Sequence, residues 1–161
     1  MEQIEELKLG VTPEAAVSGA VLLQSEYSTF LTFNAQKNTD KPSPYGGFYT
    51  ADAGTAIVEF KGCLISKFGH PNDEAAMGIP KYKDLEVAYG ICEVKGSSWI
   101  RDLEKDNNHS FPNTNYSSFR HFLIFFHDST FECIAKDIKL NISEQPYSEI
   151  IGELGGKVAA E

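Results

Sequence analysis

The sequence predicts a mainly β (α+β) fold, a single-domain antiparallel barrel or sandwich with few helices. Several short runs of alternating or branched apolar residues are separated by turn residues, as in antiparallel sheets. The densest apolar run, at 120–136, carries turn residues at its centre and therefore predicts a β-hairpin. Helical spacing is clear only at about 97–106, and a further helix is expected at about 145–155.

The N-terminal third predicts peripheral elements, a hairpin and a loop. Residues 4–9 suit a short strand or a first helical turn, and Thr12 before Pro13 suits a helix start that Gly19 ends. Apolar runs on either side of 25–28 predict a hairpin at 20–34. Residues 35–47 contain two prolines and a Gly-Gly pair without periodicity, so an exposed loop is expected there.

The middle of the chain predicts two long strand regions. The run 55–68 is too long for one ordinary strand, and Gly62 within it predicts a bend or bulge. Residues 86–95 predict another strand. Between them, the segment from Gly69 to Glu74 leads to a single helical turn at 75–77 that Gly78 ends.

The two expected helices differ in their end signals. Gly96 and the following serines open the helix at 97–106, where Trp99 falls on the apolar face. Trp99 is interpreted as an anchor against the sheet, with ligand stacking as the alternative. The C-terminal helix begins near Pro146 and is expected to end at Gly155-Gly156. Residues 1–18 and 155–161 are therefore expected to be peripheral or frayed parts of one domain spanning 1–161.

The hairpin at 120–136 predicts two unlike faces. A turn at Asp128-Ser129 would place His127 opposite Thr130, and Glu132 opposite Phe125. Side-chain alternation then makes one face wholly apolar, with Phe122, Ile124, Phe126, Phe131, Cys133 and Ala135. The other face is mixed, with His121, Leu123, Phe125, His127, Thr130, Glu132, Ile134 and Lys136.

Composition narrows the class of protein. The formal net charge of −9 and a pI near 4.9 argue against nucleic acid or an anionic membrane as partner. The first ten residues carry acidic side chains where a secretory signal has positive charge, so a cytoplasmic location is expected. Three cysteines far apart in the chain, Cys63, Cys92 and Cys133, are interpreted as reduced core residues.

Polar residues in two segments are the candidates for chemistry. Glu132 on the mixed face needs water or a partner, and His127 and Thr130 are its nearest candidates, so His127 and Glu132 are the candidate catalytic pair. Thr130, Trp99 and Tyr89 are candidate ligand-binding residues. His70, Asp73 and Glu74 could hold a divalent cation, although Asn72 or Asp73 is explained equally well as a helix cap with Glu74 in the first turn. No cofactor is assigned.

Two functional interpretations remain open. The first is a cytoplasmic, non-catalytic, acidic β-rich module that binds a basic protein, for example as an inhibitor or immunity-type protein. The second is a small-ligand or metal-dependent enzyme, with His127 as base or ligand, Glu132 as its partner, and His70, Asp73 and Glu74 supplied by the loop.

Overall fold

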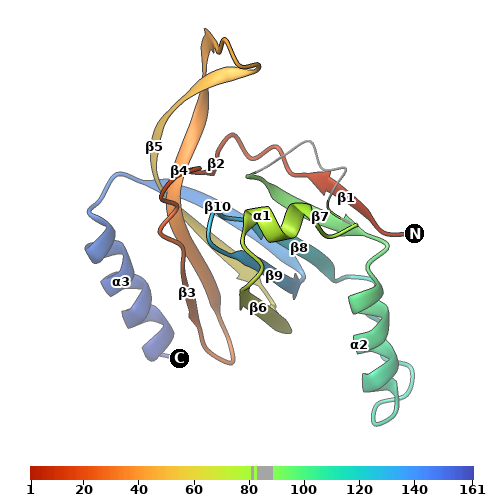
Figure 1. The fold of residues 1–161 in the computed structure, drawn as a ribbon. Helices are drawn as coiled ribbons and strands as arrows, with labels where there is room; N and C mark the ends of the chain where they lie inside the picture. The colour runs from red at the N-terminus through yellow and green to blue at the C-terminus, as the bar shows by residue number, and fades with distance from the viewer. Residues whose placement is uncertain (81, 83–88) are drawn as a thin grey trace.

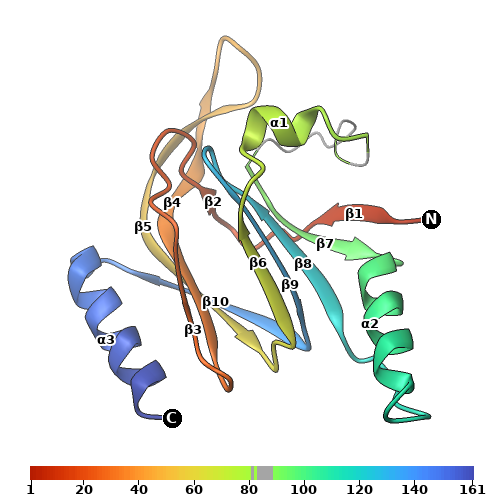
Figure 2. The same cartoon turned by 60° about the horizontal axis from the view of Figure 1, so that its bottom comes forward.

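The computed structural model describes residues 1–80, 82 and 89–161, which form two antiparallel sheets and three helices (Figures 1 and 2). The first sheet has, in spatial order, β1 (Gln3–Glu6), β7 (Ile91–Lys95), β8 (Arg120–Phe125), β9 (Thr130–Ala135) and β6 (Ile65–Gly69). The second has β10 (Asp137–Ser143), β5 (Phe48–Lys61) and β4 (Thr29–Pro42), with β2 (Thr12–Pro13) and β3 (Val21–Gln24) both paired to β4.

The mainly β prediction is confirmed, and the described strands form a sandwich-like fold and no closed barrel. The sheets are joined where β5 bends into β6 and β9 bends into β10. Gly62 makes the first bend at a φ of 58°, which glycine adopts without steric cost, so the bend predicted there is confirmed. At the second bend the Lys136 amide donates to the Lys61 carbonyl at 2.8 Å.

The core lies between the two sheets and confirms the predicted faces of the central hairpin. All six residues of its predicted apolar face are at most 1 % exposed and pack against β4 and β5. Ring contacts link the sheets, with centroid distances of 4.9 Å for Phe60 and Phe131 and 5.3 Å for Phe33 and Phe126. Such pairs stabilise by about 0.5–1.5 kcal/mol beyond the apolar area that they bury.

Helices cover the outer faces of both sheets. Helix α1 (Asp73–Met77) places Ala76 over an apolar patch of the first sheet that includes Leu123 and Phe125. Helix α2 (Ser98–Asn108) contacts β8, and its predicted start is confirmed by Ser97, whose side chain caps it. Helix α3 (Tyr147–Ala159) packs on β3 and buries Ile150 and Leu154. No helix among the described residues has the length and apolar character needed to cross a membrane.

Helix α3 runs past its expected end. Gly155 and Gly156 lie inside the helix, and the Glu161 carboxylate accepts hydrogen bonds from the hydroxyls of Ser25 and Ser28. Packing on β3 offsets the roughly 1 kcal/mol that each glycine costs a helix. At the other terminus, β1 pairs with β7 as an edge strand, so residues 3–6 belong to the sheet.

Two predictions for the N-terminal third are wrong. Residues 12–17 form no helix, because Thr12 and Pro13 pair with β4 and the Glu14 carboxylate accepts the amides of Ala16 and Val17. Residues 35–47 are mostly strand and not loop, since β4 continues to Pro42 by pairing with β5. Part of the strand expected at 86–95 is confirmed as β7, whereas residues 86–88 lie outside the described residues.

Candidate functional site

The turn of the central hairpin lies one residue earlier than predicted. The Phe126 amide donates to the Ser129 carbonyl at 2.8 Å, so His127 and Asp128 form the turn. Every pairing between β8 and β9 is therefore shifted by two residues, and Glu132 lies opposite Leu123 instead of Phe125. A shift of two leaves each side chain on its predicted face, because alternation has a period of two. The face of each side chain in the hairpin was predicted correctly, whereas its partner on the opposite strand was not.

Glu132 has a histidine partner, but not the predicted one. His121 Nε2 lies 3.1 Å from Glu132 Oε2, across the diagonal between β8 and β9. His121 is 2 % exposed and therefore lies in the interior. His127 lies in the turn and meets a different carboxylate. The candidate catalytic pair of His127 and Glu132 is thus not formed.

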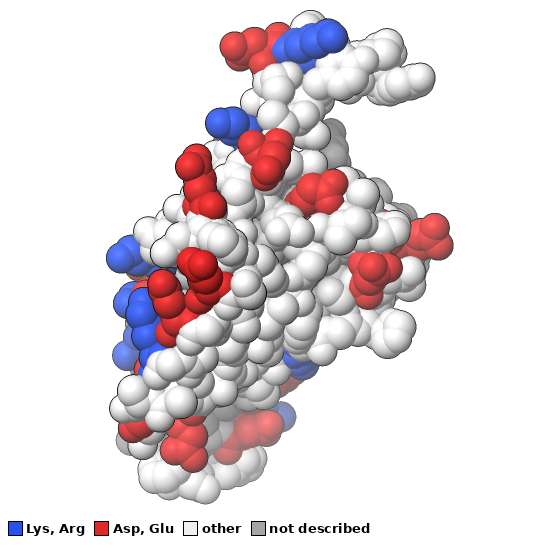
Figure 3. Space-filling view, turned by 90° about the vertical axis from the view of Figure 1, so that its left-hand side faces the viewer, with Lys and Arg blue, Asp and Glu red and all other residues white. Residues whose placement is uncertain are grey.

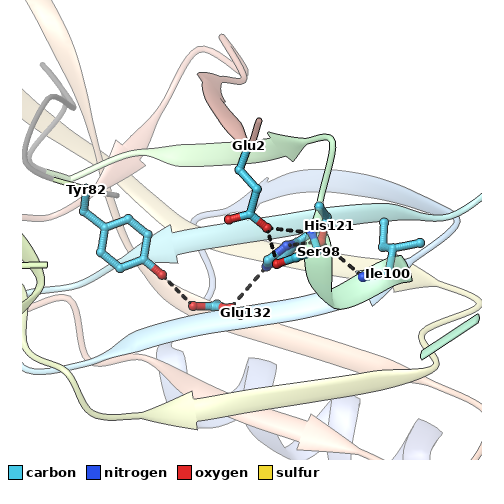
Figure 4. Close-up of polar contacts among 7 residues, drawn as sticks. Glu2, Tyr82, Ser98, Ile100, His121 and Glu132 are labelled. Carbon is cyan, nitrogen blue, oxygen red and sulfur yellow. Dashed lines mark hydrogen bonds and ion pairs between the residues drawn. The ribbon is translucent and has the colours of Figure 1, made fainter. Parts of the chain in front are cut away.

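Glu132, His121, Ser97 and Tyr82 form a continuous polar cluster on the outer face of the first sheet (Figure 4). Tyr82 Oη donates to Glu132 Oε1 at 2.9 Å, and Ser97 Oγ lies 2.9 Å from His121 Nδ1. Ser97 Oγ also accepts from the Ile100 amide, so its own proton is available to His121. The bonding pattern then assigns the imidazole proton to Nε2, which donates to Glu132.

The polar cluster ties separate parts of the chain to the sheet. Ser97 caps α2, and the Glu2 carboxylate accepts from the Ser98 amide at 2.6 Å (Figure 4). Tyr82 is buried against Phe125, with ring centroids 5.2 Å apart. Burial, followed by the negative charge of Glu132, raises the pKa of Tyr82, so it remains a hydrogen-bond donor. The cluster therefore links α2, the N-terminal segment and Tyr82 to the outer face of the first sheet.

Trp99 lies beside this cluster and is half-buried. Its ring contacts His121 edge to face at 5.2 Å, and Lys67 Nζ lies 3.7 Å from its ring centroid. A lysine over an indole face is a cation–π contact between groups of this chain. Trp99 is thus held against the sheet, as the anchor interpretation predicts, with its face occupied by Lys67. The ligand-stacking role stays a prediction.

The loop after β6 meets the hairpin turn at Asp73. Asp73 Oδ2 accepts from Tyr89 Oη at 2.6 Å and lies 2.9 Å from His127 Nδ1. The Asp73 amide donates to the His127 carbonyl, and Thr130 Oγ1 donates to the Pro71 carbonyl at 2.8 Å. These contacts position the turn one residue earlier than its local sequence suggests. Thr130 is buried here and serves this contact.

Electrostatics at Asp73 follow from these contacts. Hydrogen bonds from Tyr89 first, and then from His127, lower the pKa of Asp73. The same carboxylate raises the pKa of Tyr89 to about 12 and raises the pKa of His127. His127 is half exposed and has its Nδ1 oriented by Asp73. An imidazole held this way can exchange protons with solvent.

The predicted metal ligands do not converge. His70 and Glu74 are exposed, whereas Asp73 is engaged by Tyr89 and His127. Asn72 caps α1 by accepting from the Ala75 amide, and Asp73 and Glu74 occupy the first helical turn, as the capping interpretation predicts. Among residues 1–80, 82 and 89–161, no three His, Cys, Asp or Glu side chains are grouped to hold a metal ion.

A surface cavity lies on the other sheet, where the long β4–β5 hairpin leaves the body. It has a volume of about 710 Å³ and is lined by polar side chains that include Glu14, Asn34, Gln36, Asp52, Glu144 and Tyr147. None of its lining residues is Lys or Arg. In Figure 3, which views the α3 side, acidic side chains lie at the root of the projecting hairpin, with a basic side chain just above them. We call the cavity lined by Glu14, Asp52 and Glu144 the acidic cavity.

The three carboxylates of the acidic cavity, Glu14, Asp52 and Glu144, form no ion pair with any described residue. Glu14 accepts two backbone amides, and Asp52 Oδ1 accepts the Gly54 amide at 2.7 Å. These bonds hold the Glu14 and Asp52 carboxylates in place without neutralising them. The cavity is therefore suited to cationic groups.

Sequence reasoning missed the acidic cavity, because its residues come from four separate segments that only the fold brings together. The formal net charge of −9 was the one feature of the sequence that pointed to an acidic surface. Comparison with known proteins adds no assignment: no protein-family model, no curated protein and no solved structure matches this chain.

Proposed function

We propose that the protein is an acidic, cytoplasmic, β-rich binding module whose partner is a protein with a basic surface. The observation that carries this proposal is the acidic cavity, where three carboxylates without an ion-pair partner among the described residues face solvent. Opposite charge on a partner speeds association and selects the partner. An inhibitor or immunity-type protein that masks a basic toxin or nuclease is one concrete version.

The histidine–carboxylate contacts support a structural role more than a catalytic one. His121 and Glu132 are joined to Ser97 and Tyr82 in the polar cluster, so each has an internal partner. Within the part of the chain that the structure describes, the surface cavities of about 710, 330 and 270 Å³ are not lined by His127, Asp73 or Glu132. A catalytic base needs a substrate within hydrogen-bond reach.

The test uses a charge-matched pair of variants. Glu14→Gln, Asp52→Asn and Glu144→Gln together remove three charges from the cavity and retain oxygen acceptors for the local amides. The control removes three charges from exposed acids on β1 and α2 by Glu5→Gln, Asp102→Asn and Asp106→Asn. Each immobilised protein captures partners from lysate of the source cells at rising salt, and the captured protein is then purified and titrated.

We expect the cavity variant to bind that partner about tenfold more weakly at low salt, while the control binds like the parent. Affinity of the parent should fall as salt rises. Absence of any partner at every salt concentration, or equal weakening in both variants, would contradict the proposal.

A second candidate is a small-ligand enzyme, favoured by one observation, the orientation of half-exposed His127 by Asp73. In this form His127 is the base and Asp73 replaces Glu132 as its partner. Elemental analysis and a thermal-shift screen of metals and metabolites test it. A shift in the parent protein that disappears in His127→Ala would support this candidate, and no shift from any compound would count against it.

A further inference from the structure

The β4–β5 hairpin projects from the sandwich as a two-stranded ribbon (Figures 1 and 2). Both strands are 14 residues long. Among the described residues, pairing by the neighbouring strands stops at Gln36 on β4 and at Thr55 on β5. Beyond these points the two strands pair only with each other. We call the projecting part, residues 38–50, the arm.

Large aromatic side chains are exposed on the arm. Tyr45, Phe48 and Tyr49 are 96 %, 52 % and 43 % exposed, respectively. A two-stranded ribbon without a third strand or a covering helix is marginally stable, and exposed rings add no core to it. Aromatic side chains are enriched where proteins contact one another, because they bury a large area at a low cost in conformational entropy.

The arm has a defined shape. The Ser43 amide donates to the Gly47 carbonyl at 3.0 Å, and Gly46 and Gly47 have φ angles of 100° and 66°, which close a tight turn. Below the turn, Thr39 Oγ1 donates to the Tyr49 carbonyl at 2.9 Å, and Lys41 Nζ lies 5.0 Å from the Tyr49 ring centroid. An element ordered in this way loses less entropy on binding than a free loop would.

The arm and the acidic cavity form one surface. Strand alternation places Phe48, Thr50 and Asp52 on the same face of β5, and Thr50 and Asp52 line the cavity. Along this surface, the exposed aromatic side chains at the tip of the arm are therefore followed at its root by carboxylates that form no ion pair with a described residue. A partner that fits both has an apolar cleft bordered by Lys or Arg side chains.

We propose that the arm inserts its aromatic tip into an apolar cleft on the basic protein partner, while the acidic cavity meets Lys or Arg at the rim of that cleft. This inference rests on the proposed function and specifies how the partner is held. The rings at the tip lose their contact with water on binding, which slows dissociation of the partner. The carboxylates at the root attract the basic partner and speed its association in a salt-dependent way.

The experiment places a photo-crosslinking phenylalanine analogue at position 45 or, as the control, at position 27, where exposed Tyr27 lies in the turn at the other end of β4. Irradiation in lysate of the source cells is followed by mass spectrometry of the adducts. The crosslinked protein is then purified and titrated against Tyr45→Ser, against Tyr45→Ser with Phe48→Ser, and against Tyr27→Ser. Tyr45→Ser alone removes a side chain at the turn, so folding is preserved in at least one variant, as circular dichroism would verify.

We expect adducts from position 45 and none from position 27, and at least tenfold weaker binding for both arm variants with the salt dependence retained. Parental binding by the arm variants together with weak binding by the cavity variant would overturn the arm inference and leave the proposed function standing. Parental binding by both sets would overturn both proposals. Crosslinking of the arm to a second copy of this chain would also overturn the arm inference.

Discussion

His121 and Glu132 make a hydrogen bond of 3.1 Å across the diagonal of two neighbouring strands, and this bond joins α2 to the residue that covers the sheet, Tyr82. Each side chain of the polar cluster forms a hydrogen bond with the next one. Because the cluster is largely buried, loss of one member leaves a polar group in an apolar environment.

We expect His121→Leu to lower the free energy of unfolding by about 2–3 kcal/mol, because the Glu132 carboxylate loses a donor and Ser97 loses an acceptor. Glu132→Leu should cost a similar amount. The double variant should cost less than the sum of the two, since no half-satisfied pair remains. Urea denaturation of the four proteins measures this coupling, and strict additivity would show that the two side chains do not interact.

The contact between Asp73 and His127 predicts a pH-dependent contribution to stability. The pKa of His127 is raised above its ordinary value of 6.5, so its contribution is complete below pH 6.5 and is lost as pH rises through the folded-state pKa. The pKa of Asp73 is lowered below 3.8, so its contribution is complete above that value and is lost in stronger acid. The bond should therefore stabilise most between about pH 4 and 6.5.

Chemical denaturation of the parent protein and Asp73→Asn across this range measures the effect. The stability difference should be largest near pH 5 and smaller at pH 8. Glu74→Gln is the control, because Glu74 is an exposed neighbour of Asp73. A difference that grows between pH 5 and 8 would contradict the assigned ion pair.

Cys63 should be the most reactive thiol of the described cysteines. A hydrogen bond with Cys133 lowers the pKa of Cys63 to about 7, and Cys63 is half-buried, whereas burial raises the pKa of Cys92 to about 12. The thiolate is the reactive form. Iodoacetamide at pH 7.5 should modify Cys63 first, and Cys133→Ala, which removes the hydrogen-bond donor, should slow that reaction. Peptide mass spectrometry measures the order, and modification of Cys92 first would refute it.

The backbone at position 54, at the root of the arm, has a conformation that requires glycine. Its φ is 85°, and a Cβ there would lie 2.7 Å from the Ser143 carbonyl oxygen. Gly54→Ala should lower stability by about 3 kcal/mol, from positive-φ strain together with the clash. Gly47→Ala, with a φ of 66° and open space around it, is the matched control and should cost about 1 kcal/mol. Equal melting temperatures for the two variants would contradict this account.

Local patterns predicted several elements correctly, for reasons visible in single residues. Asn72 and Ser97 are helix caps in the sequence and in the structure, because a cap depends on backbone groups within a few residues. Gly62 marks a real bend for a similar reason. The strand at 35–42 was predicted as a loop, because its residues have low β propensity and become strand only by pairing with β5.

The candidate site was predicted only in part. His127 and Asp73 were both named as candidates, and the fold brings them together with Tyr89. Burial of His121 was missed, because a histidine beside an arginine at the start of a strand resembles an edge position. The acidic cavity was missed because its carboxylates are far apart in the sequence and each looks like an ordinary surface acid.

The sequence by itself determined that the chain is mainly β and which side of the central hairpin faces the core, because side chains alternate with a period of two and hydrophobic burial needs one continuous apolar side. Only the tertiary structure decided the pairing within that hairpin. The turn could move by one residue without changing which side chains face the core. Contacts from Asp73 and Pro71, which are 54 and 59 residues away from their partners in sequence, selected between the two registers.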